Sequence, residues 1–316
     1  MFSKLKLFTG NANPELAKEV ASFAGVPLGD AEVFKFSNDD TFVKINDNVR
    51  GTDAFIIQST CNPVNDSMME LLIMIDALKR ASAQRISVVI PYYGYARSDK
   101  KDQPRVPITA KLVADLITVA GADRVITVDL HADQIQGFFN IPVDHLFSIP
   151  IFVRYIKSMG IEEERLVVVS PDSGGANRAR ALAKRLNCSL AIGDKRRTGN
   201  DDNAEVLNVI GDVKGKIAIL FDDIIDTGGS MIKIASKLEE LGAERIFAAC
   251  VHGVLSGNAA ERLENSPIEK LFITNTIPLT TKNRNCKKIN QLSIAELLAT
   301  AIKKIHLEES ISILFR

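Results

Sequence analysis

The chain has 316 residues, of which 46% are hydrophobic and 25% are charged, so it has the apolar material for a large core and the length for two domains. Lysine plus arginine and aspartate plus glutamate each number 39, and this balance excludes the overall positive charge with which proteins hold a nucleic-acid backbone. The four cysteines form no Cys-x-x-Cys pair and no apolar run is long enough for a signal peptide or a membrane span, so we expect a cytoplasmic enzyme with no zinc ribbon, disulfide framework or membrane partner.

Short apolar, β-branched runs alternate with helical patterns along the chain. The predicted strands cover residues 55–58, 86–92, 125–128, 166–169, 217–221, 246–251 and 271–274. Apolar residues at three- and four-residue spacing predict helices over residues 68–81, 110–119, 176–186, 231–241 and 294–305. This alternation predicts an α/β fold of mainly parallel sheets flanked by helices.

The weakest break in this pattern lies near residues 147–150, so we expect domains over residues 1–148 and 149–316. A weak internal echo links residues 90–99, IPYYGYARSD, with residues 220–230, LFDDIIDTGGS. Each follows a predicted strand with a charged, glycine-containing loop, where doubly wound sheets bind ligands. If the halves are related, one could hold a nucleotide and the other a sugar phosphate, with the chemistry in the crevice between them.

Two segments of the first half combine aromatic and charged side chains. Residues 34–45 read FKFSNDDTFVKI and residues 92–101 read YYGYARSDKK. Either is a surface loop, or their rings and polar groups hold an adenine by stacking and hydrogen bonding.

The segment Asp129 to Gln134, DLHADQ, follows the predicted strand 125–128. A lone histidine is usually structural, but the carboxyl end of a strand favours contact between His131 and a metal phosphate. His145, His252 and His306 have no such setting, and we expect them to be structural.

A second strand end, residues 170–180, reads SPDSGGANRAR. Gly174 and Gly175 would expose backbone donors at a helix start, and Arg178 and Arg180 could bind phosphoryl oxygens, which suits a diphosphate. Asp172 could hold the accompanying Mg²⁺. The alternative is an ordinary glycine turn with exposed arginines.

Three consecutive cations, Lys195 to Arg197, precede a polar stretch, residues 198–203, with the sequence TGNDDN, which we expect to be a mobile loop. Cations on a loop are often only solvated. Phosphoryl transfer, however, needs cations that neutralise charge moving toward the leaving oxygen.

The most informative segment is residues 216–230, KIAILFDDIIDTGGS. A predicted strand ends at Phe221 and is followed by the adjacent carboxylates Asp222 and Asp223, which suit ribose hydroxyls or Mg²⁺. The turn from Asp226 to Ser230 offers glycine N–H groups, hydroxyls and a helix N-terminus to a phosphate. An ordinary helix cap is the alternative, and the preceding strand and carboxylates favour a phosphoribosyl site.

Strings along nearly the whole chain resemble the ribose-phosphate diphosphokinase family, also called phosphoribosyl pyrophosphate synthetases. The most specific are RGTDAFIIQSTCNPVN and VDLHADQIQGFF, joined by YYGYARSDKK, PDSGGANRARALAK, DKRR, DDIIDTGGS and the terminal ESISILF. The resemblance implies two phosphoribosyltransferase-like domains with the last helix against the N-terminal half. It also implies Mg²⁺-dependent transfer of the β,γ-diphosphoryl group of ATP to the C1 hydroxyl of ribose 5-phosphate, giving AMP, by a homo-oligomer that is dimer-based and favours a hexamer.

The resemblance also implies a role for each matching residue. Lys195 and Arg197 would stabilise the transition state, and His131 and Asp172 would organise Mg²⁺. Ribose 5-phosphate would be held by Asp222, Asp223, Asp226, Thr227, Gly228, Gly229 and Ser230. ATP would be bound, partly from a neighbouring subunit, by Phe36, Asn38, Asp39, Asp40, Arg97, Ser98 and Asp99.

The chain departs from the family pattern in several places. Asn38-Asp39-Asp40 replaces the usual Asp-Gly-Glu and Ser98 the usual Gln, so adenine hydrogen bonds should differ in detail. The loop after Arg197 is longer and more acidic than in the family. Residues 101–104 lack the usual Arg-Ser, and this second departure argues against the family's usual regulation by phosphate and ADP. Two other functions are compatible with the predicted phosphoribosyl site: a non-catalytic regulatory subunit of a synthetase, and a phosphoribosyltransferase that joins the activated sugar to a base.

Overall fold

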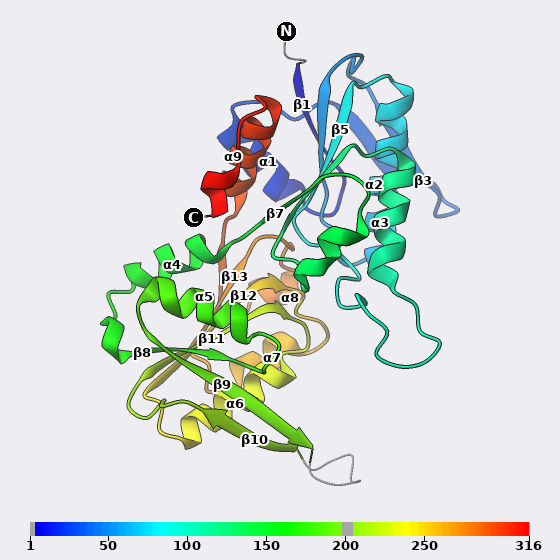
Figure 1. The fold of residues 1–316 in the computed structure, drawn as a ribbon. Coiled ribbons are helices and arrows are strands. Elements are labelled where there is room, and N and C mark those ends of the chain that lie inside the picture. Colours follow the sequence, from blue (N-terminus) through cyan, green and yellow to red (C-terminus); the bar gives the residue numbers. More distant parts are fainter. Residues whose placement is uncertain (1–3, 198–204, 316) are drawn as a thin grey trace. The chain divides into compact units, whose positions relative to one another are not determined.

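The computed structural model describes residues 4–197 and 205–315, and these form two compact units (Figure 1). Unit 1 comprises residues 1–147, 276–278 and 293–316, and unit 2 comprises residues 148–275 and 279–292. The chain therefore passes from unit 1 to unit 2 and back more than once. Each unit has its own sheet and its own hydrophobic core.

The sheet of unit 1 is entirely parallel, with the strand order β1-β4-β5-β6-β7. The strands are β1 (Leu5–Thr9), β4 (Asp53–Ile57), β5 (Arg85–Ile90), β6 (Arg124–Val128) and β7 (Val143–Leu146). The central strands are rich in valine and isoleucine and are buried along almost their whole length, as strands covered on both faces must be. The strand order shows no reversal.

The helices of unit 1 cover both faces of this sheet (Figure 1). They are α1 (Pro14–Ala24), α2 (Val64–Arg80), α3 (Thr109–Ala120) and α9 (Ala295–His306), with the 3₁₀ turns η1 (Asp133–Phe138) and η3 (Ser312–Phe315). Helices α2 and α3 bury Leu71, Met74 and Val113 in one core cluster with alternate strand residues. Helix α9 packs on α1, where Lys303 Nζ donates a hydrogen bond to the Phe23 carbonyl (3.3 Å).

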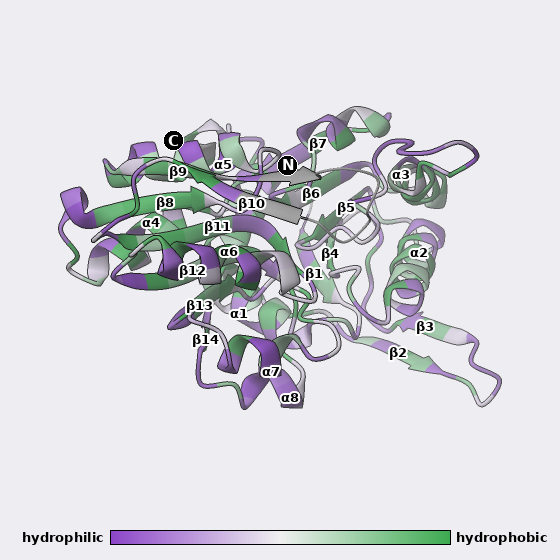
Figure 2. Ribbon diagram, turned by 90° about the horizontal axis from the view of Figure 1, so that it is seen from below, coloured by the Kyte–Doolittle hydropathy of each residue, from purple (hydrophilic) through white to green (hydrophobic). Residues whose placement is uncertain are grey.

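A two-stranded antiparallel hairpin, β2 (Ala31–Lys35) and β3 (Thr41–Ile45), lies beside α2 and extends away from the rest of unit 1 (Figure 2). The Lys35 ammonium pairs with Asp66 on α2 at 2.8 Å. Asn11 Nδ2 donates to the carbonyl of Val33 (3.1 Å) and to the buried carboxylate of Glu70 (2.9 Å). These contacts fix the middle and the far end of β2, while the turn at residues 36–40 stays exposed.

The larger sheet, in unit 2, has the order β10-β9-β8-β11-β12-β13-β14 and is parallel except for β10. Its strands are β8 (Leu166–Ser170), β9 (Ser189–Arg197), β10 (Glu205–Ile210), β11 (Ile217–Ile225), β12 (Arg245–Gly253), β13 (Lys270–Thr274) and β14 (Ile289–Leu292). The helical elements are α4 (Ile149–Ser158), η2 (Glu163–Arg165), α5 (Ala176–Leu186), α6 (Gly229–Glu240), α7 (Ala259–Glu264) and α8 (Thr281–Arg284).

Unit 2 contains a topological switch point between β8 and β11. After β8 the chain continues through α5 to β9 on one side, and after β11 it continues through α6 to β12 on the other side. Open α/β sheets bind ligands at the carboxyl ends of the strands where the order reverses. The turns at residues 171–175 and 226–229 are therefore neighbours at one edge of this sheet.

The predicted α/β alternation is confirmed, because every predicted strand and helix is present with its ends shifted by a few residues. One boundary was wrong: the strand predicted to end at Phe221 continues to Ile225. The partly exposed hairpin and the strands β1, β7, β9, β10 and β14 were not predicted, and Lys195 to Arg197, expected on a loop, belong to β9. Within the described ranges, no helix is both long and apolar enough to span a bilayer.

Candidate active site

Strand β11 carries the predicted carboxylate pair inside the sheet rather than in a loop after it. Asp222 pairs in register with Cys250 of β12, and Asp223 is 3% exposed. The N–H of Asp223 donates to Asp222 Oδ1 (2.9 Å), so the two carboxyl groups lie close together. The expectation that both follow the strand is corrected by the ladder bonds, which continue through Ile224 and Ile225.

The turn after β11 has the geometry of an anion cradle. Gly228 has φ of 74°, a left-handed conformation that glycine adopts without strain, and α6 begins at Gly229. The first N–H groups of a helix have no partner within the helix and point outward with the positive end of the dipole. Thr227 and Ser230 are exposed beside them. Asp226 to Ser230 therefore connect the end of β11 to the first turn of α6.

Arg178 of α5 joins the two carboxylates of β11. Its Nη1 atom lies 2.9 Å from Asp223 Oδ1 and 3.5 Å from Asp222 Oδ1. The sequence predicts that Arg178 binds phosphoryl oxygens, but in this structure its guanidinium is bound to the two carboxylates. The pKa of Asp222 is raised to about 8, chiefly by burial and then by the charge of Asp223, and Arg178 opposes the shift.

This raised pKa predicts a pH dependence of stability. Between about pH 4 and 8 the folded protein holds a proton on Asp222 that the unfolded chain releases, so the free energy of unfolding should fall as pH rises through that window. Thermal melts of the parent and of Asp222→Asn from pH 5 to 9 measure it. The variant should lose that part of the pH slope, and an unchanged slope would show that another group is responsible.

The turn after β8 is held by its own polar groups. Asp172 Oδ1 accepts the N–H of Gly175 (3.0 Å), and Ser170 Oγ donates to the carbonyl of Asp172 (2.6 Å). A Cβ on Gly175 would lie 2.8 Å from Ser170 Oγ, so a side chain there would force the Ser170 hydroxyl to move. The Asp172 side chain is exposed at the switch point, in the turn next to the one that follows β11.

The two predicted catalytic cations lie on β9. Ile192 pairs with Ser170, the last residue of β8, so residues 193–197 continue past the end of β8 at the edge that holds both turns. The backbone of Lys195 and Arg197 therefore lies at the sheet edge that holds the turns after β8 and β11. The side chains of both residues and the predicted loop 198–203 lie outside the described residues.

In unit 1, the hairpin tip carries four of the predicted ATP ligands: Phe36, Asn38, Asp39 and Asp40. Asp39 has a positive φ of 68°, and Asn38 Nδ2 donates to Asp40 Oδ2 (2.6 Å). Phe36 packs edge-on against Phe34 at 5.4 Å between ring centroids, yet it is 49% exposed. An exposed aromatic face beside hydrogen-bonding groups is suited to stacking on a base.

The other ATP ligands follow β5. Arg97 is exposed and Ser98 half-buried, whereas Asp99 is buried and accepts a hydrogen bond from Gln134 Nε2 (3.0 Å). That bond ties this loop to the segment after β6 that carries the exposed His131. The hairpin and the loop after β5 both contact the first turn of α2, through the Lys35–Asp66 ion pair and through a hydrogen bond between Tyr95 and Asn65.

The predicted structural histidines have structural contacts. His145 Nε2 accepts the N–H of Leu130 at 2.8 Å, and His306 Nδ1 lies 2.8 Å from the buried Asp53 carboxylate. In the part of the chain that the structure describes, no group of three or more His, Cys, Asp or Glu side chains could enclose a metal ion. The predicted ligands His131 and Asp172 belong to different units.

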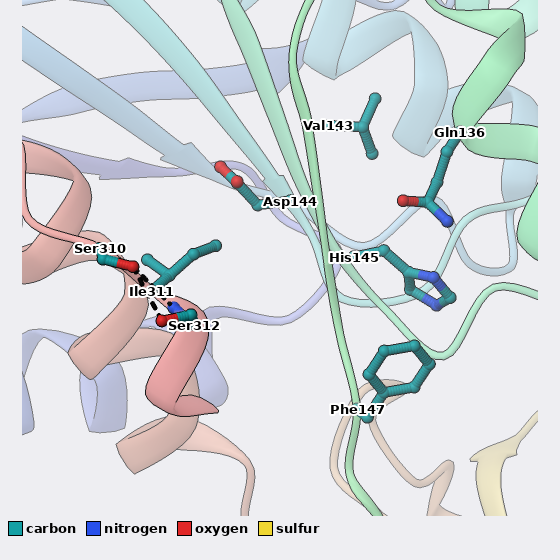
Figure 3. A pocket seen from close by; sticks show the side chains of 8 residues that line it. All are labelled: Gln136, Val143, Asp144, His145, Phe147, Ser310, Ile311 and Ser312. Atoms are coloured by element: carbon teal, nitrogen blue, oxygen red, sulfur yellow. Dashed lines mark hydrogen bonds between the residues drawn. The ribbon is translucent and has the colours of Figure 1, made fainter. Parts of the chain in front are cut away.

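A cavity of about 380 Å³ in unit 1 was not anticipated from the sequence (Figure 3). It is lined by Gln136, Val143, Asp144, His145, Phe147, Ser310, Ile311 and Ser312, and none of the predicted site residues is among them. Ser312 N–H donates to Ser310 Oγ at 3.2 Å, which shapes the wall formed by the C-terminal segment. The strings VDLHADQIQGFF and ESISILF each contribute residues to its wall, and neither indicates a cavity.

The fold and the cradle together define an α/β protein of the class that binds phosphorylated sugars and nucleotides at strand carboxyl ends. Residues 5–121 match the family model for the N-terminal domain of ribose phosphate pyrophosphokinase, and residues 200–316 match that for the phosphoribosyl synthetase-associated domain. The chain belongs to the ribose-phosphate pyrophosphokinase family.

Similar proteins cover the whole chain. A ribose-phosphate pyrophosphokinase of Clostridium perfringens is 55% identical over 99% of this chain and 98% of its own, and one of Bacillus subtilis is 53% identical over 98% and 97%. The crystal structure of phosphoribosylpyrophosphate synthetase from Mycobacterium smegmatis superimposes with a TM-score of 0.91 at 45% identity, covering 96% of this chain and 99% of that one. The predicted family, fold class and enzyme class are confirmed.

Proposed function

We propose that the protein catalyses Mg²⁺-dependent transfer of the β,γ-diphosphoryl group of ATP to the C1 hydroxyl of ribose 5-phosphate, which yields 5-phosphoribosyl 1-diphosphate and AMP. The observation that carries this proposal is the cradle from Asp222 to Ser230 beside the Asp172 turn at the switch point of unit 2. This arrangement offers carboxylates to sugar hydroxyls and backbone donors to a phosphate at one edge of the sheet.

Ribose 5-phosphate is held by the cradle. The turn from Asp226 to Ser230 binds the 5-phosphate through N–H groups and hydroxyls, while Asp222 and Asp223 accept hydrogen bonds from ribose hydroxyls. Arg178 keeps the two carboxyl groups in place.

ATP is bound by the residues of unit 1. Phe36 stacks on the adenine, and Asn38, Asp39 and Asp40 provide polar contacts at the hairpin tip. Arg97, Ser98 and Asp99 supply further contacts from the loop after β5. The contacts of Val33 and Lys35 on β2 position the first group relative to α2.

The exposed Asp172 carboxylate is an oxygen ligand of the kind that Mg²⁺ takes, and the substrate phosphates would supply others. Mg²⁺ usually keeps several waters and takes only one or two protein carboxylates, so a complete protein cage is not required. His131 and the exposed Asp172 carboxylate are the residues that would hold it. When bound, Mg²⁺ neutralises charge on the phosphate chain.

Lys195 and Arg197 provide the positive charge that stabilises the transferring diphosphoryl group and the leaving AMP oxygen. We further propose a cytoplasmic homo-oligomer built from dimers, with a hexamer as the favoured state and with ATP contacts supplied partly by a neighbouring subunit. Sedimentation analysis of the purified protein tests the assembly.

Incubation of the purified protein with ATP, ribose 5-phosphate and Mg²⁺ should release AMP, and omission of any one of the three should abolish the release. A properly assembled protein that forms no AMP would refute the proposal. A regulatory subunit would be silent alone and would co-purify with an active partner, whereas a phosphoribosyltransferase would release diphosphate only when a base is added. Lys195 and Arg197, which a purely regulatory subunit would be expected to lose, favour the catalytic function.

A further inference from the structure

An arginine outside the predicted site lies over the cradle. Arg262 is exposed on the short helix α7, and a Cβ placed on Gly229 would lie 3.9 Å from its Nη1 atom. The same point would lie 3.8 Å from Thr227 Oγ1. The guanidinium and the threonine hydroxyl therefore flank the first residue of α6.

The backbone fixes this placement. The N–H of Leu255 donates to the carbonyl of Ile225 (3.1 Å), and the N–H of Ser256 donates to the carbonyl of Asp226 (3.1 Å). Helix α7 then buries Ala259, Ala260 and Leu263 in the core of unit 2. This burial fixes the rotation of α7, and the Arg262 guanidinium lies next to Gly229.

Negative charges near the cradle would repel a bound phosphate unless a cation lies close by. Asp223 and Asp226 carry negative charge within or just before the turn, while Arg178 is bound to Asp223 and to the protonated Asp222. A sugar phosphate carries close to two negative charges at neutral pH, so it would enter an acidic neighbourhood. Among the residues that the structure describes, the Arg262 guanidinium makes no ion pair or side-chain hydrogen bond, so it can neutralise that charge.

We propose that Arg262 binds the 5-phosphate of ribose 5-phosphate and makes the site selective for a phosphorylated over an unphosphorylated pentose. This inference rests on the proposed function. The planar guanidinium can donate two parallel hydrogen bonds to a phosphate, whereas the backbone N–H groups of the turn approach it from the other side.

The test is steady-state kinetics of AMP formation by Arg262→Gln. The KM for ribose 5-phosphate should rise about tenfold or more, since a charge-assisted hydrogen bond to phosphate is lost, while the KM for ATP should stay within about twofold. Arg262→Lys should show a smaller rise because it keeps the charge without the planar fork. An equal rise in both KM values would indicate a general structural role and would overturn the inference.

Two matched variants serve as comparisons. Arg245→Gln removes an exposed arginine at the amino end of β12, where it pairs with Glu269 (2.6 Å), and should leave both KM values unchanged. Lys233→Gln removes the cation one turn into α6. If Lys233→Gln raises the KM for ribose 5-phosphate and Arg262→Gln does not, the phosphate contact belongs to Lys233 and the inference is wrong.

Calorimetric titration with ribose 5-phosphate and with ribose, in the absence of ATP, separates this inference from the proposed reaction. Parent protein that binds the phosphorylated sugar but makes no AMP would refute the reaction, and a loss of that binding in Arg262→Gln would still support the inference. Active parent protein with unchanged binding in the variant would refute the inference alone. Parent protein that binds ribose as tightly as ribose 5-phosphate would refute it as well. Thermal melts of Arg262→Gln should match the parent, because the side chain is exposed.

Discussion

Replacement of Lys195 by alanine should lower kcat about a thousandfold and leave ATP binding nearly unchanged. A group that stabilises charge only in the transition state contributes to turnover rather than to ground-state binding, and loss of one such group typically costs 10²- to 10³-fold or more. Lys195 stems from β9 at the same sheet edge as the cradle and the Asp172 turn. Single-turnover AMP formation measures the chemical step, and nucleotide titration measures the affinity.

The matched control is Lys216→Ala, at the opposite end of the same sheet. Lys216 Nζ donates to Ser189 Oγ at 3.0 Å, so its removal deletes a lysine and one hydrogen bond far from the carboxyl ends of the strands. Turnover of this variant should stay close to that of the parent. An equal loss of turnover and of ATP affinity in Lys195→Ala would mean that this lysine supports binding or folding instead.

Replacement of Arg178 by methionine should lower the free energy of unfolding by about 2–3 kcal/mol. Removing one partner of a fully buried ion pair costs about 3–5 kcal/mol, and the partial exposure of Arg178 and Asp222 reduces that figure. The change leaves two adjacent carboxylates without their cation, of which the Asp223 side chain is only 5% exposed. Denaturant melts of parent and variant, followed by fluorescence of a bound dye or by circular dichroism, give the difference.

A second substitution distinguishes lost charge from lost packing. Arg178→Met combined with Asp223→Asn should recover most of the stability, because the amide removes the charge of the more buried carboxyl group. Arg180→Met, an exposed neighbour on α5, should change the free energy of unfolding by less than about 0.5 kcal/mol. If the double variant is no more stable than Arg178→Met alone, the guanidinium contributes through packing rather than through charge.

The parts of the fold that could be predicted are those in which local pattern and burial agree. Strands such as β8 and β12 are continuous apolar runs because helices cover both faces of their sheet, and the helices between them have a clear apolar face. The glycine turn after β11 was also predictable, since Gly228 takes a left-handed conformation that few other residues tolerate.

The parts that could not be predicted depend on contacts between distant segments. Asp222 and Asp223 were taken for loop residues because charges are rare inside strands, and only the approach of Arg178 across the switch point explains them. Nothing in the sequence placed α7 beside the cradle, since that placement rests on backbone hydrogen bonds from Leu255 and Ser256. The hairpin was missed because its strands are half exposed and lack a clean alternation.

The repeated passage of the chain between its two units limits how the protein can be dissected. Residues 276–278 and 293–316 belong to unit 1, although most of unit 2 precedes them in the sequence. A gene fragment that stops near residue 148 would omit α9, whose His306 meets the buried Asp53 and whose Lys303 meets the end of α1. Neither half is therefore encoded by one continuous stretch, and synthesis on the ribosome must reach the last helix before the first-made sheet can be fully covered.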